Sequence, residues 1–287
     1  MKRLIVNADD FGLAPGINRA IAEAHERGIL TSTTLMASAP AFDDALTIAR
    51  QYPKLKIGCH LVLLRGSLLE KPGTAPSLYR HRSGEAVVRQ GLGEFALDAW
   101  RGRVHPADIT REINAQIGRI IATGIAPTHV DSHKHSHVLP GVFRPMLRAA
   151  RELGIRAVRN PFEPPLPVSL LFPRRHLWKR YGATRVMRAW CRAFLRCVRE
   201  LDMVTTGGTI GITSTGSLDQ QLLSVLLQYL PEGTFELICH PAYDSPELTG
   251  LTRLGRSGEI ERGLLMSEES KQAITAAGIE LISYADL

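Results

Sequence analysis

The sequence lacks long hydrophobic runs and has little cysteine, and both absences exclude classes of protein. No apolar stretch reaches the roughly 18 residues of a membrane-spanning helix. The four cysteines include no CxxC pair, which argues against a disulfide framework and a cysteine-ligated zinc site. The opening residues have too short an apolar stretch and become acidic too soon to form a secretory signal, so we expect a cytoplasmic protein.

Positive charge is concentrated in one segment of the chain. Between Arg174 and Arg199 there are nine Lys and Arg residues and no Asp or Glu. These nine charges exceed the net charge of the whole chain, +7, so the remainder is slightly acidic. Such a distribution argues against a protein that coats nucleic acid, and we expect no nucleic-acid partner. The 287 residues, 44% of them hydrophobic, predict a single domain over 1–287.

Short apolar runs alternate along the chain with amphipathic stretches that have the periodicity of helices. The predicted strands are Leu4–Asn7, Thr33–Ala37, Lys56–Leu63, Thr128–Asp131, Arg156–Arg159, Thr209–Ile212, Phe235–Cys239 and Glu280–Ser283. The predicted helices are Pro15–Arg27, Ala41–Gln51, Pro106–Ala122, Val142–Leu153, Ser217–Leu230 and Glu268–Ala277. Repeated strand–helix units imply a mostly parallel sheet covered by helices. Seven or eight units favour a closed or slightly irregular (β/α) barrel, with an open doubly wound sheet as the alternative.

Two long segments interrupt this alternation. Arg65–His105 contains scattered glycine and proline, and we expect an active-site loop with little regular structure. Asn160–Thr206 is interpreted as an insertion within the single domain. It begins with a proline-rich, extended stretch and continues as a helical excursion.

Polar residues suited to catalysis follow several of the predicted strands. Asp9 and Asp10 follow the first strand and His60 lies in the third, while His133 and His240 follow the fourth and the seventh. In a parallel barrel these strand ends meet at one face. Adjacent carboxylates are costly unless a cation offsets their repulsion. One carboxylate with two imidazoles is typical of a metal site that keeps positions open, although any single histidine is more often structural.

Four motifs together resemble the YdjC family of carbohydrate deacetylases, which is related to NodB-type polysaccharide deacetylases. They are Asn-Ala-Asp-Asp-Phe-Gly at 7–12, Gly-Cys-His-Leu-Val-Leu at 58–63, Asp-Ser-His-Lys-His-Ser-His at 131–137 and His-Pro-Ala at 240–242. The resemblance extends from Leu4 to about Leu281 and implies a deformed, TIM-like (β/α) barrel with a divalent metal. One small departure is Ala242, where the family more often has glycine.

The resemblance also implies roles for individual residues. Asp9 would be the general base, His240 the general acid, and Arg159 a group that orients the catalytic carboxylate. The implied metal ligands are Asp10, His60 and His133, with His135 or His137 left open as a substitute for His133. We assign His135, His137, Phe11 and Tyr243 to the substrate pocket. Imidazole ligands favour Zn²⁺ while the family is usually described with Mg²⁺, so both ions stay open.

The basic segment contains a predicted amphipathic helix, Thr184–Leu201. Its apolar side would carry Val186 and Phe194, and its other side would carry arginines. The two interpretations are a helix packed on the barrel and a helix lying on an anionic membrane at its inner face.

The second interpretation suits the branch of the family associated with hopanoid biosynthesis, whose implied substrate is an N-acetylglucosaminyl hopanoid. The alternatives are a deacetylase of chitooligosaccharides such as diacetylchitobiose, a metal-dependent phosphoesterase or amidohydrolase, and a noncatalytic binding barrel. Oligomeric state stays open, with a homodimer as one option.

Overall fold

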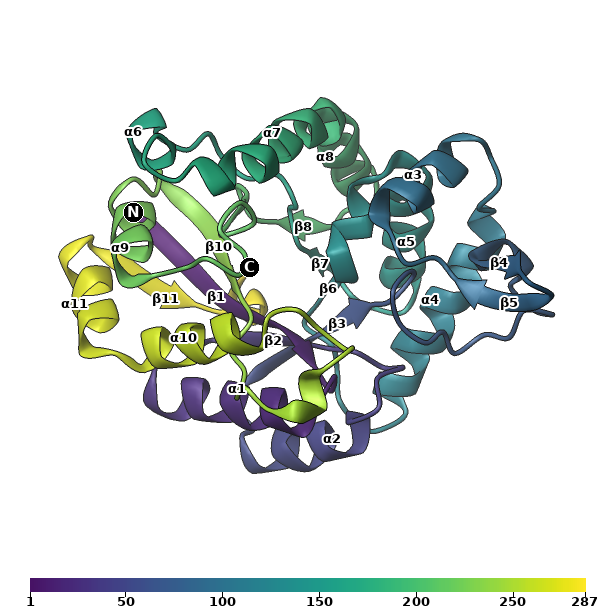
Figure 1. The fold of residues 1–287 in the computed structure, drawn as a ribbon, viewed down its shortest axis with the longest axis horizontal. Coiled ribbons are helices and arrows are strands. Elements are labelled where there is room, and N and C mark those ends of the chain that lie inside the picture. Colours follow the sequence, from purple (N-terminus) through teal and green to yellow (C-terminus); the bar gives the residue numbers. More distant parts are fainter.

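Nine parallel strands form one curled sheet at the centre of the molecule, a deformed barrel of the TIM type (Figure 1). The computed structural model describes residues 1–287, except for the side chains of Val168 and Ser169. Eight strands follow one another in the order β8-β7-β6-β3-β2-β1-β10-β9, and β11 pairs with β1 outside this path. Their bounds are β1 (Lys2–Phe11), β2 (Ser32–Leu35), β3 (Lys56–Leu61), β6 (His129–Ser132), β7 (Ala157–Val158), β8 (Val204–Thr205), β9 (Thr209–Ile210), β10 (Gly233–Cys239) and β11 (Ile279–Ile282).

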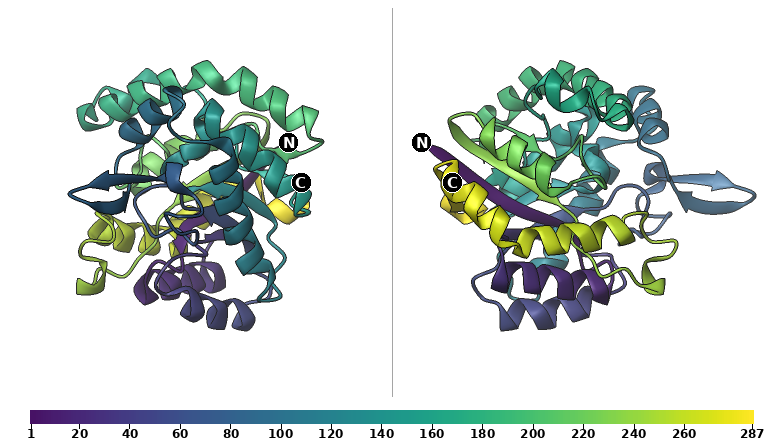
Figure 2. Two further views of the ribbon diagram at one scale, coloured as in Figure 1. Left: turned by 90° about the vertical axis from the view of Figure 1, so that its right-hand side faces the viewer. Right: turned by 60° about the vertical axis from the view of Figure 1, so that its left-hand side comes forward.

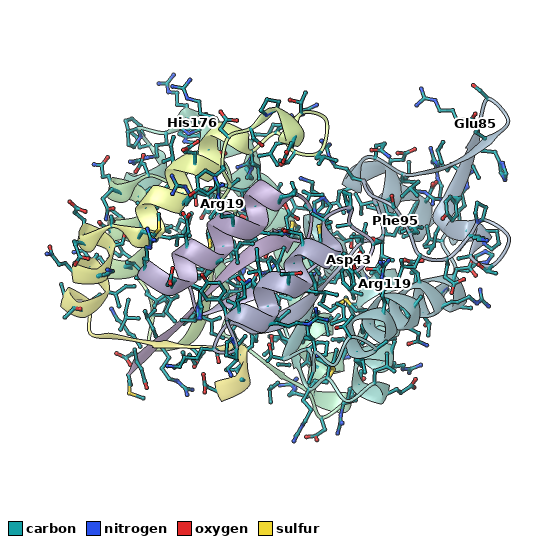
Figure 3. All side chains as sticks on the ribbon, turned by 90° about the horizontal axis from the view of Figure 1, so that it is seen from below. Arg19, Asp43, Glu85, Phe95, Arg119 and His176 are labelled. Atoms are coloured by element: carbon teal, nitrogen blue, oxygen red, sulfur yellow. The ribbon has the colours of Figure 1, made fainter. Side chains whose placement is uncertain are left out.

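Helices cover the outside of this sheet, as the views in Figure 2 show. Their bounds are α1 (Pro15–Arg27), α2 (Phe42–Gln51), α3 (Leu92–Trp100), α4 (Pro106–Ile121), α5 (Pro140–Glu152), α6 (Val168–Leu171), α7 (Trp178–Met187), α8 (Cys191–Glu200), α9 (Gln220–Gln228), α10 (Gly255–Met266) and α11 (Glu268–Ala276). The view from below shows α1, which carries Arg19, lying beside α2, which begins near Asp43 (Figure 3). The predicted deformed barrel is confirmed, and each of the eight predicted strands corresponds to an observed one.

The side chains of β1 explain why the barrel has two hydrophobic layers. Because successive strand residues point to opposite faces, Leu4 and Val6 join the large core under the outer helices. Ile5 belongs instead to a small cluster with Ala157, Ile282 and Tyr284. The face that carries Ile5 also carries Asn7 and Asp9 further along the strand. This face leads from the small cluster to the carboxyl end of β1.

The barrel is bridged by side chains where its two terminal strands approach. β8 and β9 are the ends of the strand path, although only a few residues separate them in the chain. The side-chain amide of Asn160 donates to the carbonyl oxygen of Thr206 at 2.9 Å. The hydroxyl of Thr209 donates to the carbonyl oxygen of Asn160 at 2.7 Å. These hydrogen bonds satisfy backbone carbonyl groups between β8 and β9, which do not pair with each other.

The expectation of a loop with little regular structure at 65–105 is wrong. This segment contains an antiparallel hairpin, β4 (Tyr79–Arg82) and β5 (Glu85–Val88), followed by α3. Figure 3 shows Glu85 far out on this hairpin and Phe95 on α3 closer to the barrel. The fully buried Asp98 of α3 accepts hydrogen bonds from Arg80 and Arg89, both at 2.8 Å. This ion-pair cluster ties the hairpin to the helix, and no local periodicity signals it.

The predicted single helix Thr184–Leu201 is instead the end of α7, a tighter turn at Arg188–Trp190, and α8. Phe194 and Val198 of α8 are buried, as the first interpretation requires, but Val186 is 66% exposed. Arg188 donates to the carbonyl oxygen of Glu163 at 3.0 Å. The apolar face of α8 is therefore covered by protein and is not available to a bilayer. Within the described residues, no helix combines the length and apolar character needed to cross a membrane.

Candidate functional site

Asp9 and Asp10 line the same cavity although neighbouring strand residues ordinarily face opposite sides. Asp10 has a φ of 66°, and the pairing of β1 with β2 shifts register between Ala8 and Phe11. This irregularity turns the Asp10 carboxylate toward the cavity that Asp9 already faces. A left-handed conformation costs a non-glycine residue about 1–2 kcal/mol, and such strain is typical of functional sites.

Asp10, His60 and His133 come together at the bottom of the cavity. Oδ1 of Asp10 lies 3.1 Å from Nδ1 of His133 and 3.5 Å from Nε2 of His60. One ligand atom from each of the three residues lies within 4.8 Å of the others. The structure therefore brings His133, rather than His135, to the Asp10 carboxylate. This group of atoms is a candidate binding site for a metal ion.

His60 is oriented by a carboxylate behind it. His60 and Asp131 are register partners on the adjacent strands β3 and β6, and Nδ1 of His60 lies 2.7 Å from Oδ1 of Asp131. When the Nδ1–H group of His60 donates a hydrogen bond to this carboxylate, Nε2 is directed at Asp10 and can ligate a metal. Burial alone would lower the pKa of His60, but the charges of Asp131 and Asp9 raise it to about 9. In the absence of a metal, both ring nitrogens of His60 therefore carry a proton at neutral pH.

Asp9 is held by a buried arginine. Nη1 and Nη2 of Arg159 donate to its two carboxylate oxygens at 2.9 and 2.6 Å, and Asn7 donates to Oδ1 at 3.1 Å. Burial alone would raise the pKa of Asp9, but the charge and hydrogen bonds of Arg159 hold it well below its usual range. Asp9 is therefore ionised at neutral pH, and its geometry is fixed from the side opposite the cavity.

Arg159 is the centre of a larger buried network. Its side chain is fully buried and also pairs with Asp131 and with Glu236, the latter at 2.6 Å. Glu236 in turn accepts the hydroxyl of Tyr284 at 2.6 Å. Sequence analysis missed both carboxylates. Asp131 stood inside a recognised motif, and Glu236 is an acid within the apolar strand Gly233–Cys239, a pattern that indicates a buried partner.

His240 lines the same cavity as Asp9 and lies next to it. Its Nε2 lies 4.0 Å from Oδ2 of Asp9, and its backbone N–H donates to Glu261 at 2.6 Å. Nδ1 of His240 is buried and has no hydrogen-bond partner among the described residues. The residue is therefore anchored through its backbone, and its imidazole presents Nε2 to the Asp9 carboxylate.

The other predicted pocket residues are placed differently. His135 lines the cavity, and burial lowers its pKa to about 3. His137 lies behind it, fully buried, with Nδ1 2.6 Å from Oγ of Ser132. Phe11 is fully buried in the core, and Tyr243 donates to Glu23 at 2.6 Å between α1 and α10. His137, Phe11 and Tyr243 are not among the residues that line this cavity, and a contact between them and substrate stays a prediction.

The cavity has a volume of about 480 Å³ and opens beside Arg65, Lys134, Arg180 and Arg253. A second hollow of about 500 Å³ adjoins it, and Arg65, Gln90, His133 and Leu251 border both. Burial and the charges of the neighbouring arginines lower the pKa of Lys134. The site is thus acidic at its bottom and basic at its mouth.

Fold and site together define a class: parallel α/β barrels with a buried carboxylate–imidazole cluster at the carboxyl ends of the strands. Residues 3–276 match the family model described as YdjC-like protein, and the chain belongs to this family.

Relatives align over almost the whole chain. A carbohydrate deacetylase of Brevibacillus brevis is 32% identical over 99% of this chain and 99% of its own length. A carbohydrate deacetylase of Geobacillus stearothermophilus is 33% identical over 98% and 96%. A chitooligosaccharide deacetylase of Yersinia enterocolitica is 32% identical over 99% of both chains. A crystal structure from Enterococcus faecalis V583, named for cellobiose-phosphate cleavage, has a TM-score of 0.79 at 26% identity and covers 99% and 98%.

Proposed function

We propose that this chain is a metal-dependent hydrolase that removes the N-acetyl group from an amino sugar. The observation that carries the proposal is the clustering of Asp10, His60 and His133 within 4.8 Å, in a cavity that Asp9 and His240 also line. A binding protein has no need of a carboxylate and an imidazole placed together beside a candidate metal site. Relatives named for deacetylation of carbohydrates support the same activity.

The three clustered side chains would hold the metal. One carboxylate and two imidazoles leave coordination positions open, and this donor set suits Zn²⁺ better than Mg²⁺, which prefers oxygen ligands. The pairing of His60 with Asp131 at 2.7 Å fits this role, because metal-binding histidines usually donate their second N–H to a carboxylate or carbonyl. When bound, the ion would polarise the acetyl carbonyl and make a neighbouring water more acidic.

Asp9 and His240 would divide the proton transfers between them. Asp9, kept ionised by Arg159, accepts a proton from the water whose oxygen attacks the acetyl carbon. His240, which lines the same cavity, donates a proton to the sugar nitrogen as the carbon–nitrogen bond breaks. The products are acetate and a free amine. Arg159 acts as a positioning residue, because its guanidinium contacts Asp9 from behind and does not line the cavity.

Two proposals concern which acetylated sugar the protein uses. Relatives named for chitooligosaccharides support a soluble oligosaccharide. The N-acetylglucosaminyl hopanoid stays a prediction, and its structural support is the exposed Trp178 on α7, the helix that also brings Arg180 to the cavity. Peripheral contact with an anionic membrane and a homodimer likewise stay predictions.

Product analysis separates these possibilities. The purified protein, loaded with Zn²⁺ or Mg²⁺, is incubated with diacetylchitobiose, with an N-acetylglucosaminyl hopanoid and with p-nitrophenyl phosphate. We expect acetate from at least one of the sugars and no phosphate. Phosphate release without acetate would replace the proposal by a phosphoesterase, and sugar binding without either product would replace it by a noncatalytic barrel.

A further inference from the structure

Tyr284 lies in the interior of the barrel and is not among the residues that line the cavity. It begins the short turn Tyr284–Asp286 after β11 and belongs to the small hydrophobic cluster that contains Ile5. Its ring stacks on the imidazole of His129, with the ring centroids 3.6 Å apart and the planes inclined by 12°. A Cβ atom at Gly58 would lie 2.4 Å from that imidazole, so the stack is tightly enclosed. The position of the Tyr284 ring is therefore fixed by packing, independently of its hydroxyl group.

The hydroxyl of Tyr284 completes the hydrogen bonding of Glu236. It donates to Oε2 of this carboxylate at 2.6 Å, and the hydroxyl of Thr209 donates to the same oxygen at 3.0 Å. Nε and Nη2 of Arg159 supply the other two donors, at 2.9 and 2.6 Å from Oε1. A carboxylate has about four acceptor positions, and here all of them are occupied. Because Glu236 is fully buried, bulk water cannot replace a donor that is removed.

Arg159 divides its N–H groups among three carboxylates. Nε and one N–H of Nη2 face Glu236, and the remaining groups of Nη1 and Nη2 face Asp9 and Asp131. The guanidinium has no spare donor, so a stronger demand from one carboxylate is met at the expense of another. The hydroxyl of Tyr284 is a neutral donor, and it satisfies Glu236 without drawing further on this single positive charge. Asp9 thereby keeps both of its guanidinium hydrogen bonds.

We propose that Tyr284 is a positioning residue for Asp9. It acts through Glu236 and Arg159, the buried ion pair that lies between the two. This inference rests on the proposed deacetylase function, in which Asp9 accepts the proton of the attacking water. When the hydroxyl of Tyr284 is removed, Glu236 compensates by pulling the guanidinium toward itself, and the carboxylate of Asp9 moves with it. A remote substitution that displaces a catalytic group by about 1 Å costs up to about 100-fold in rate.

A double-mutant cycle in kcat separates positioning from a merely structural role. Acetate release from diacetylchitobiose and from the N-acetylglucosaminyl hopanoid is measured for the native protein, Tyr284→Phe, Asp9→Asn and the double variant, and kcat is expressed per bound metal. Phenylalanine keeps the ring on His129 and removes the hydroxyl alone. We expect Tyr284→Phe to lower kcat about tenfold, with KM changed less than about twofold. In the Asp9→Asn background the same substitution should change kcat less than about twofold, because the base that it positions is absent.

Tyr79→Phe is the matched control. The hydroxyl of Tyr79 donates to the carbonyl oxygen of Glu70, also at 2.6 Å, and Tyr79 is not among the residues that line the cavity. Its loss should leave kcat within about twofold of the native value.

The side-chain Nε–H of Arg159 gives a readout without catalysis. It is observed by NMR of the full-length protein, labelled with isotopic arginine and kept in chelator, and its signal is identified by its absence from Arg159→Lys. We expect this signal to shift in Tyr284→Phe, because Nε faces Glu236, and to stay in place in Tyr79→Phe.

The outcomes separate this inference from the proposed function. If no acetylated sugar releases acetate while the Arg159 signal shifts as expected, the deacetylase proposal fails and the connection from Tyr284 to the guanidinium stands. If acetate is released but Tyr284→Phe costs the same factor with and without Asp9, or leaves kcat unchanged, the positioning role is wrong and the deacetylase proposal stands. An Arg159 signal that does not move in Tyr284→Phe would also overturn the positioning role.

Discussion

Asp131 links the candidate metal site to the buried network around Arg159, and replacing it by asparagine isolates that link. Its carboxylate accepts from Nδ1 of His60 at 2.7 Å and from Oγ1 of Thr34 at 3.3 Å, and it pairs with Arg159. Asparagine has nearly the same size but no charge, and its NH₂ group must face a donor on one side. The variant should therefore leave His60 free to rotate and to change tautomer.

The expected magnitude follows from this environment. Loss of an outer partner of a metal ligand typically weakens metal binding by about 10–100-fold. Because Asp131 is fully buried and solvent cannot replace its hydrogen bonds, we expect the upper end of that range, or about 2.7 kcal/mol. The loss of folding stability should be smaller than the roughly 3–5 kcal/mol of a fully broken buried ion pair, because Arg159 keeps Asp9 and Glu236.

Competition between the protein and a chromophoric chelator for Zn²⁺ measures the affinity, and circular dichroism verifies the fold. Asp98→Asn is the matched control, since Asp98 is equally buried and bound by arginines but pairs with no candidate metal ligand. An unchanged affinity in Asp131→Asn, or an equal loss in both variants, would refute the assignment of Asp131 as the group that orients His60.

Three further predictions concern neighbouring groups. Asp9→Asn should retain its metal and lose about 10²–10⁴-fold in kcat, and metal content and acetate release measured on one preparation would expose any loss of metal instead. Because the pKa of His60 is raised from 6.5 to about 9, its stabilising charge is complete below 6.5 and disappears as pH rises through 9. The Tm of the metal-free protein should fall over that window while Zn²⁺ binding tightens and releases a proton, and a flat Tm would contradict this. Arg159→Met should destabilise the fold by about 3–5 kcal/mol in urea unfolding, because it leaves Asp9, Asp131 and Glu236 buried without their cation; an effect below about 1 kcal/mol would count against the network.

The barrel and the acidic end of the site could be predicted because their signals are local. Apolar runs define the strands, and a histidine inside the apolar strand around His60 already indicates a partner. The Asp131–His60 pair could not be predicted, because it depends on the register between β3 and β6. The hairpin at 79–88 depends on the distant Asp98. The four cations at the cavity come together only through the tertiary fold, so their separate positions in the sequence gave no signal.

The segment that contains α7 and α8 was predicted only in part. Periodicity correctly predicted that Phe194 and Val198 lie on one buried face. It could not show that a tighter turn at Arg188–Trp190 interrupts the helix or that Arg188 donates to the backbone of Glu163. Both features depend on the path of the extended segment that precedes the helices.

The central claim is that Asp10, His60 and His133 hold a metal that the deacetylation requires. The most direct test is acetate release by the protein after chelation, followed by stepwise addition of Zn²⁺ or Mg²⁺, with Asp10→Ala and the control Asp98→Asn treated in parallel. We predict that chelation abolishes activity, that one equivalent of metal restores it in the native protein and in Asp98→Asn, and that Asp10→Ala neither binds that equivalent nor recovers. Full activity in chelator, or restoration of Asp10→Ala by stoichiometric metal, would contradict the claim.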